Sequence, residues 1–218
     1  MVLVLFVITL AAATAVGMVY RVTEEPIALA KAAKTTSALS EVLPAFDNNP
    51  AEEKQAFDME GIPVVVYPAK KGGETVGYAV ETATKRGFSG DIRMMVGFLP
   101  DGKIQNITVL QHAETQGLGS KIADPDNVLV VSFRGNSPAN LQMSVRKTGG
   151  DIDAITASTI SSMAYIDAVE RGYRAMKALR GEDVVSGATN YCTDGSETDV
   201  VSGATNTPNE NEKGEDHE

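Results

Sequence analysis

The sequence is poor in the residues that form disulfides and metal centres. Its 218 residues include one cysteine, two histidines and no tryptophan. A disulfide needs two cysteines, and structural zinc sites and iron–sulfur clusters need several Cys or His ligands. His112 and Glu114 would supply two ligands without partners, which is too few for a metal site. We therefore expect no disulfide and no metal, and any redox chemistry must use another cofactor.

The chain also lacks a cluster of basic residues. It has 19 Lys and Arg against 29 Asp and Glu, for a net charge of −10. Residues 182–218 hold ten acidic residues and one lysine, so most of the negative charge lies in this tail. Nucleic-acid binding needs clustered Lys and Arg against the phosphates, so nucleic acid is not an expected partner. The tail has almost no large apolar side chains, and we predict that it is disordered.

One long apolar run stands at the N-terminus. Residues 1–20 carry no charge, and as a helix they would be about 30 Å long, which matches the hydrocarbon thickness of a bilayer. We predict a transmembrane anchor at 1–20 and a helical connector at 21–62. A cleavable signal peptide is the alternative, because Ala13-Thr14-Ala15 fits the small-x-small cleavage rule. The cations that follow weakly favour a cytoplasmic side for the rest of the chain: Arg21, Lys31 and Lys34.

Runs of β-branched and apolar residues predict two hairpins. The first would pair 63–68 with 75–84 around a Lys-Gly-Gly-Glu turn. The second would pair 91–99 with 103–110 around Pro100-Asp101-Gly102, a strong turn sequence. Both hairpins favour an antiparallel sheet.

A helix is predicted near the end of the folded region. Its apolar stripe recurs at three- and four-residue steps, and Gly181 would close it: Ile166, Val169, Tyr173, Met176 and Leu179. Residues 141–147 read as a further strand, and residues 45–61 as an exposed connection or a short helix. We predict an α+β fold, with a mainly antiparallel sheet and packed helices in a domain at 63–181.

The stretch before this helix is rich in small and hydroxyl residues. Residues 153–162 read DAITASTISS. Small side chains let an anion approach the backbone, and a helix N-terminus offers unpaired N–H groups and the positive end of the helix dipole. The stretch therefore suits a phosphate, although hydroxyl residues that simply cap the helix are the alternative.

The same pattern returns twice in the tail, at 183–190 and 199–206, which both read DVVSGATN. The pattern resembles the flavin-attachment sequence of the RnfG/NqrC family, which comprises the G subunit of the Rnf electron-transport complex and the C subunit of the sodium-translocating NADH:quinone reductase. The resemblance implies that a flavin transferase links FMN to a threonine through a phosphoester. The matching threonine is Thr159, with Thr156, Ser158 and Ser161 around the cofactor. The tail copies would make Thr189 and Thr205 additional sites of flavinylation.

Two further segments carry the same resemblance. Residues 112–119 are similar to the family's Glu-Thr-Pro-Gly-Leu-Gly segment, with Gln116 at the proline position. Residues 87–90 are similar to its Gly-[Phe/Tyr]-x-Gly bend. The resemblance implies that the first segment lines the isoalloxazine ring through four residues: Glu114, Thr115, Gly117 and Leu118.

The family implies a function for the whole chain. It would be a single-pass flavoprotein of the inner (cytoplasmic) membrane, with the FMN-binding domain on the periplasmic or extracellular side. It would relay electrons with other membrane subunits of an ion-translocating ferredoxin:NAD⁺ oxidoreductase, without being catalytic alone, and membrane lipid would surround its anchor. The alternatives are a flavoprotein that serves the quinone reductase instead, and an extracytoplasmic interaction domain that carries no flavin.

Overall fold

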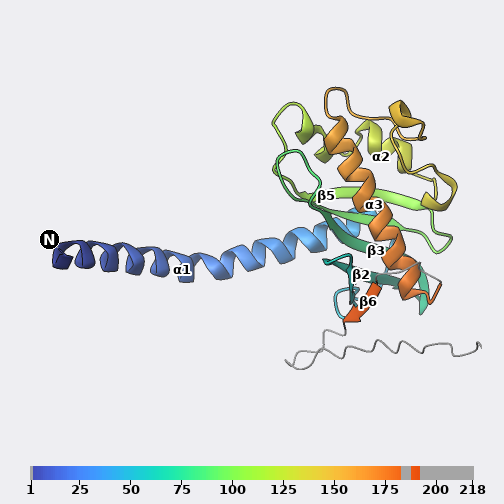
Figure 1. The fold of residues 1–218 in the computed structure, drawn as a ribbon. Coiled ribbons are helices and arrows are strands. Elements are labelled where there is room, and N and C mark those ends of the chain that lie inside the picture. The colour runs from blue at the N-terminus through green and yellow to red at the C-terminus, as the bar shows by residue number, and fades with distance from the viewer. Residues whose placement is uncertain (1, 183–187, 192–218) are drawn as a thin grey trace, which may run out of the picture.

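The computed structural model describes residues 2–182 and 188–191. A long N-terminal helix, α1 (Val2–Val42), comes first in the chain, and one α+β domain follows it (Figure 1). Within these described residues, six strands form a single sheet in the order β5-β4-β3-β2-β1-β6, and every neighbouring pair is antiparallel. The strands are β1 (Gln55–Met59), β2 (Ile62–Lys71), β3 (Glu74–Thr84), β4 (Ile92–Phe98), β5 (Ile104–Gln111) and β6 (Ala188–Tyr191).

The remaining helices lie in the second half of the chain. Helix α3 is long and α2 is short. Three separate 3₁₀ turns lie in the same part of the described chain. Their bounds are α2 (Val128–Phe133), α3 (Thr159–Leu179), η1 (Gly119–Ala123), η2 (Pro138–Asn140) and η3 (Arg146–Thr148). The predicted apolar stripe of α3 is largely buried, and Gly181 follows its end with a φ of 69°. The prediction of this helix is therefore confirmed.

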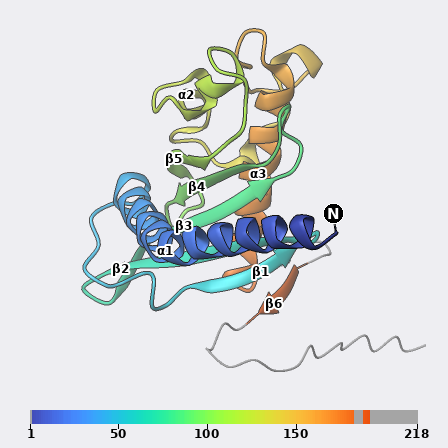
Figure 2. The same cartoon turned by 90° about the vertical axis from the view of Figure 1, so that its left-hand side faces the viewer.

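The sheet has a different helix on each face. Helix α3 covers one face, and its stripe joins the strands in the larger core cluster (Figure 1). The C-terminal end of α1 packs on the other face, where Ala38, Leu39 and Val42 are buried beside Tyr67 and Met95. Figure 2 shows the two helices on opposite sides of the strands. The site described below lies at one end of α3.

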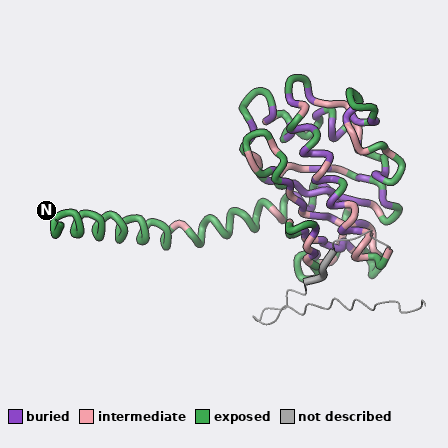
Figure 3. The backbone as a smooth tube through the Cα atoms, viewed as in Figure 1, coloured by how far each residue is buried: buried purple, intermediate pink, exposed green. Residues whose placement is uncertain are grey.

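Most of α1 is exposed in the described part of the chain. Its first turns are exposed along their whole length, and burial begins only near residue 38 (Figure 3). Among the described residues, this is the one helix long and apolar enough to cross a membrane, with a mean hydropathy of 2.6 in its most apolar window. The apolar side chains of this part of α1 are not buried against protein, as they would be in the core helix of a soluble protein.

Both predicted hairpins are present. Strands β2 and β3 pair around Gly72 and Gly73, and β4 pairs with β5 around Pro100-Asp101-Gly102. Two other expectations are wrong. Residues 45–61 contain strand β1, because Phe57 and Met59 bury their side chains while the backbone pairs with β2.

Residues 141–147 do not form a sheet strand. Val145 makes one isolated bridge, with Ile152, and a 3₁₀ turn follows at once. The stretch alternates between apolar and polar residues, but no strand among the described residues pairs with it. In the tail predicted to be disordered, residues 188–191 form β6 against β1, and 183–187 and 192–218 lie outside the described residues.

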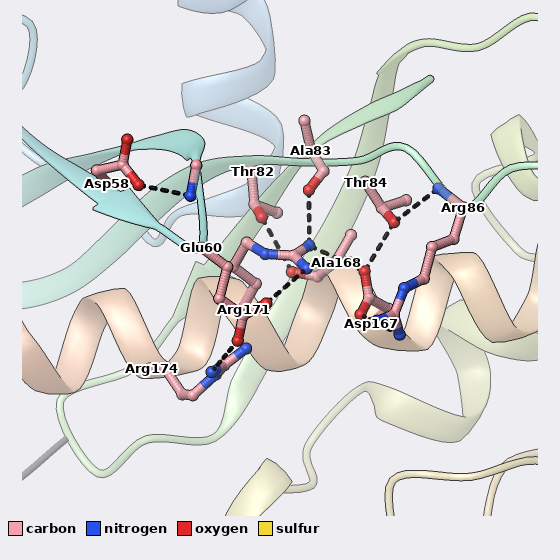
Figure 4. A network of polar contacts seen from close by, with 11 residues as sticks. Asp58, Glu60, Thr82, Ala83, Thr84, Arg86, Asp167, Ala168, Arg171 and Arg174 are labelled. Atoms are coloured by element: carbon pink, nitrogen blue, oxygen red, sulfur yellow. Dashed lines mark hydrogen bonds and ion pairs between the residues drawn. The ribbon is translucent and has the colours of Figure 1, made fainter. Parts of the chain in front are cut away.

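A buried arginine attaches the middle of α3 to the sheet (Figure 4). Arg171 is 2% exposed, and its Nη1 donates to the Ala83 carbonyl and to Asp167 Oδ2, at 2.9 Å each. Its Nη2 lies 3.4 Å from Glu60 Oε2. Thr84 Oγ1 also donates to Asp167, at 2.7 Å. Burial alone would raise the pKa of Asp167, but the hydrogen bonds from Thr84 and Arg171 hold that pKa below its usual range.

Candidate functional site

A cavity of about 360 Å³ opens at the N-terminal end of α3. Three segments that are far apart in the sequence form its walls: the loop between β3 and β4, the loop after β5, and the start of α3 with the residues just before it. The lining residues are Phe88, Glu114, Thr115, Leu118, Gly119, Ala157, Ser158, Thr159, Ile160 and Ser161. Its volume lies within the range of small-molecule sites, which runs from about 300 to 1,000 Å³.

The first turn of α3 presents unpaired backbone donors to this cavity. The first helical hydrogen bond runs from the Ser162 amide to the Ser158 carbonyl, at 2.9 Å. The amides of residues 159–161 precede it and have no partner within the helix. Ser158 stands at the N-cap, and its side chain makes no capping hydrogen bond. The simple N-cap that was the alternative for this stretch is therefore not formed by Ser158.

The Ser162 side chain fixes the turn before the helix. Its Oγ accepts a hydrogen bond from the Ile155 amide at 3.0 Å and donates to the Ser158 carbonyl at 2.9 Å. The same turn places Ala157 at a φ of 62°. A left-handed conformation is unusual for a residue with a Cβ atom. Glycine stands at the corresponding position of both tail copies, Gly187 and Gly203.

The Glu114 carboxyl group lies at the centre of the three walls. It is 4% exposed. Ser161 Oγ donates to its Oε2 at 2.5 Å, and the Ser89 amide donates to its Oε1 at 3.2 Å. The backbone amide of Glu114 donates to His112 Nδ1 at 3.3 Å. The loop after β5 is thereby joined to α3 and to the loop between β3 and β4.

The structure brings together most of the residues predicted from the sequence. Thr159, Ser158, Ser161, Glu114, Thr115 and Leu118 all line the cavity. Thr156 and Gly117 are exposed and are not among its lining residues, although Gly117 has the positive φ, 78°, that favours glycine.

Sequence reasoning missed Ile160 as a lining residue. Its only signal was its position beside Thr159. Of the tail threonines, Thr189 lies in β6, where its backbone pairs with Asp58, and Thr205 lies outside the described residues.

The cavity fits FMN in its chemistry. Exposed apolar side chains stand around it, with Phe88 66%, Ile160 53% and Leu118 46% exposed, and they would cover the faces of a flat ring system. The unpaired amides of α3 suit a phosphate group. Within residues 2–182 and 188–191, no group of three or more His, Cys, Asp or Glu could hold a metal ion.

Comparisons with known proteins place the same region in a family. Residues 87–174 match the FMN-binding domain family, and this range includes every residue that lines the cavity. The chain is 34% identical over 161 residues to the G subunit of the ion-translocating oxidoreductase complex of Haemophilus influenzae, covering 70% of this chain and 77% of that protein.

Two other relatives match over more of the chain. The G subunit of the same complex in Cereibacter sphaeroides is 32% identical, with coverage of 83% of this chain and 84% of that protein. The G subunit of the Na⁺-translocating ferredoxin:NAD⁺ oxidoreductase complex of Acetobacterium woodii is 33% identical, with coverage of 81% and 90%. These matches confirm the resemblance in the sequence, and the chain belongs to the RnfG family, as an FMN-binding subunit of an ion-translocating oxidoreductase complex.

Proposed function

We propose that this chain carries FMN as a covalent cofactor, esterified through its phosphate to Thr159 Oγ1. The observation that carries the proposal is the position of Thr159, which lines the cavity in the first turn of α3. A phosphate on this hydroxyl would lie beside the unpaired amides at the helix N-terminus. The adjoining walls would then receive the ring system.

The chain's own residues bind and shield the cofactor. Phe88, Leu118 and Ile160 offer apolar contact area, and Thr115 and Ser158 add hydroxyl groups to the lining. FMN supplies one- and two-electron transfer, while the protein supplies position and electrostatics. The chain therefore acts as an electron carrier within a redox complex and has no substrate chemistry of its own.

The hydroxyl of Thr159 has little nucleophilicity by itself. No histidine among residues 2–182 and 188–191 lines the cavity, and the carboxyl group of Glu114 already accepts hydrogen bonds from Ser161 and Ser89. Formation of the ester would therefore need a separate flavin transferase as maturation partner. With FAD as the donor, the activated Thr159 oxygen would bond to the FMN phosphorus while the pyrophosphate bond breaks and AMP leaves with the second phosphate.

Helix α1 supports a membrane anchor for the chain. The apolar part of this helix would cross the lipid bilayer once, and the rest of α1 would connect the span to the FMN-binding domain. We place that domain on the periplasmic or extracellular side, as the family resemblance implies. The relative from Acetobacterium woodii, by its name, acts between ferredoxin and NAD⁺. We propose the same overall reaction, coupled to ion translocation, for the complex that contains this chain.

Mass spectrometry of the full chain tests the covalent bond. The full chain is expressed with and without a flavin transferase and purified from the membranes. Its peptides are then mapped by mass. We expect an FMN phosphoester on the peptide that contains Thr159, and its loss in Thr159→Val. Thr75→Val is the matched control, because Thr75 is half-buried like Thr159 but lies in β3, outside the attachment sequence and away from the cavity lining. An unmodified Thr159 peptide in the presence of active transferase contradicts the proposal.

The tail copies are tested in the same samples. We propose that Thr205 and Thr189 are additional sites of flavinylation, because their sequences repeat the motif without needing a packed domain. Modified tail peptides that persist in Thr159→Val would support this. Tail peptides at their unmodified mass would reject it and leave Thr159 as the single site.

A further inference from the structure

Both oxygens of the buried Glu114 carboxyl group are held by the protein. Oε2 accepts from Ser161 Oγ, and Oε1 accepts from the Ser89 amide. Among residues 2–182 and 188–191, no salt bridge includes Glu114. A buried carboxyl group costs free energy unless hydrogen bonds compensate for its lost hydration. Here one hydroxyl and one backbone amide provide that compensation.

These two donors belong to different walls of the cavity. Ser89 follows Phe88 in the loop between β3 and β4, and Ser161 follows Thr159 and Ile160 in α3. Glu114 itself begins the third wall, in the loop after β5. One carboxyl group therefore links all three walls, and the Ser161 contact spans 47 positions of sequence.

Two glycines enclose the same carboxyl group. A Cβ atom on Gly87 would lie 2.6 Å from Glu114 Oε1, and a Cβ atom on Gly119 would lie 2.7 Å from Oε2. The Cβ atom on Gly119 would also approach Ser161 Oγ to 2.9 Å. A larger side chain at Gly119 would displace the carboxyl group or Ser161, and one at Gly87 would first meet the Gly90 carbonyl oxygen, 2.1 Å from its Cβ atom. The loops are thus fitted around Glu114 on both sides.

We propose that Glu114 is a positioning residue that sets the geometry of the FMN pocket by clamping its three walls together. It acts through Ser161 and Ser89, and its role differs from a direct contact that tunes the isoalloxazine ring. The inference rests on the proposed function in so far as the clamped pocket holds FMN. The clamp itself is a property of the protein without cofactor.

The first test uses the full chain without flavin, so that it does not depend on the proposed function. Amide hydrogen exchange at Ser89 reports directly on the bond to Glu114. We expect Glu114→Ala to speed this exchange by roughly tenfold, since the Ser89 amide loses its acceptor and a hydrogen bond of about 1 kcal/mol with it. Glu114→Gln keeps an acceptor and a polar partner for Ser161, and we expect it to restore part of the protection. Glu170→Ala is the control, because it removes an exposed carboxylate from the same helix as Ser161.

The second test uses the flavinylated chain. If Glu114 orients the pocket, Glu114→Ala and Ser161→Ala should change the visible circular dichroism of the bound flavin in the same way. The double variant should add little to either single change, because both remove one interaction. The visible spectrum of Glu170→Ala should match that of the unchanged protein.

The outcomes separate the two proposals. Faster Ser89 exchange in a chain that never acquires flavin would support the clamp and reject the proposed function. The clamp would be overturned if the amide exchange rate of Ser89 stayed within about twofold of the wild-type rate in three folded variants. These variants are Glu114→Ala, Glu114→Gln and Ser161→Ala. A shifted flavin spectrum with unchanged exchange would also overturn it, because Glu114 would then act on the ring directly.

Discussion

Ala157 is held in a backbone conformation that suits glycine better. Its φ of 62° costs an alanine roughly 1–2 kcal/mol. Glycine avoids this cost but loses more backbone entropy on folding, by roughly 0.5–1 kcal/mol. We therefore predict that Ala157→Gly raises the free energy of unfolding by about 0.75 kcal/mol, the difference between the midpoints of these two costs. Denaturant unfolding of the full chain in detergent would measure this change.

Ala139→Gly is the control for this prediction. Ala139 is exposed, and it is not among the described residues with positive φ. Glycine there should lower the free energy of unfolding, because only the entropy cost remains. A lower stability of Ala157→Gly would show that the alanine methyl group contributes packing that outweighs the strained backbone.

The sequence indicated some residues of the site but not the hydrogen bond that joins Ser161 to Glu114. The hydroxyl-rich stretch and the helix that follows are local features, and they predicted a helix start suited to a phosphate. The choice of Thr159 within that stretch came from the family resemblance. The bond between Ser161 and Glu114 joins residues in separate segments, and no periodicity or spacing connects them. It could be found only after the sheet had brought the loop after β5 to the start of α3.

At the scale of elements, the attachment of α3 to the sheet depends on Arg171. We predict that Arg171→Ala lowers the free energy of unfolding by about 3 kcal/mol, because it removes the buried donor of the Ala83 carbonyl and the guanidinium partner of Asp167. Asp167 then keeps only its contacts with Thr84 and Arg86 among the described residues. Arg174→Ala is the matched control. The Arg174 side chain is 28% exposed and pairs only with Glu60 among the described residues, so its loss should cost under about 1 kcal/mol.

The same cluster predicts a dependence of stability on pH. The pKa of Asp167 is lowered in the folded state, so its contribution to stability is complete above the ordinary carboxylate pKa. That contribution is lost as the pH falls below about 4 and through the folded-state pKa. Asp167→Asn should flatten this part of the stability curve. An unchanged acid limb in urea unfolding between pH 5 and pH 2 (about the range where carboxylates titrate) would contradict the assignment.

Elements were predicted well where their own residues determine them. The helix stripe from Ile166 to Leu179 and the two hairpins carry strong local patterns. Strand β1 was missed because only Phe57 and Met59 are large and apolar, and its pairing with β2 makes it a strand. Residues 141–147 show the opposite error. Their alternating pattern predicted a strand, but within the described residues they make only one bridge, at Val145.

At the scale of the whole molecule, α1 determines how the domain is displayed. Its 41 residues would measure about 62 Å as a straight helix, which is twice the thickness of the hydrocarbon layer. Only its end is buried against the sheet. The domain would therefore stand away from the bilayer on an extension of the spanning helix. This geometry is the same for either orientation, so the side of the membrane needs its own experiment.

The single cysteine of the chain makes that experiment direct. Cys192 follows the FMN-binding domain in sequence, and no other thiol competes for labelling. We predict that a membrane-impermeant maleimide labels the full chain in intact spheroplasts, because the domain and its tail would lie outside the cytoplasmic membrane. Cys192→Ser provides the unlabelled control. Labelling that begins only after the membrane is permeabilised would place the domain in the cytoplasm, as Arg21, Lys31 and Lys34 weakly favour. The orientation implied by the family resemblance would then be wrong, whereas the FMN pocket and its Glu114 clamp would be unaffected.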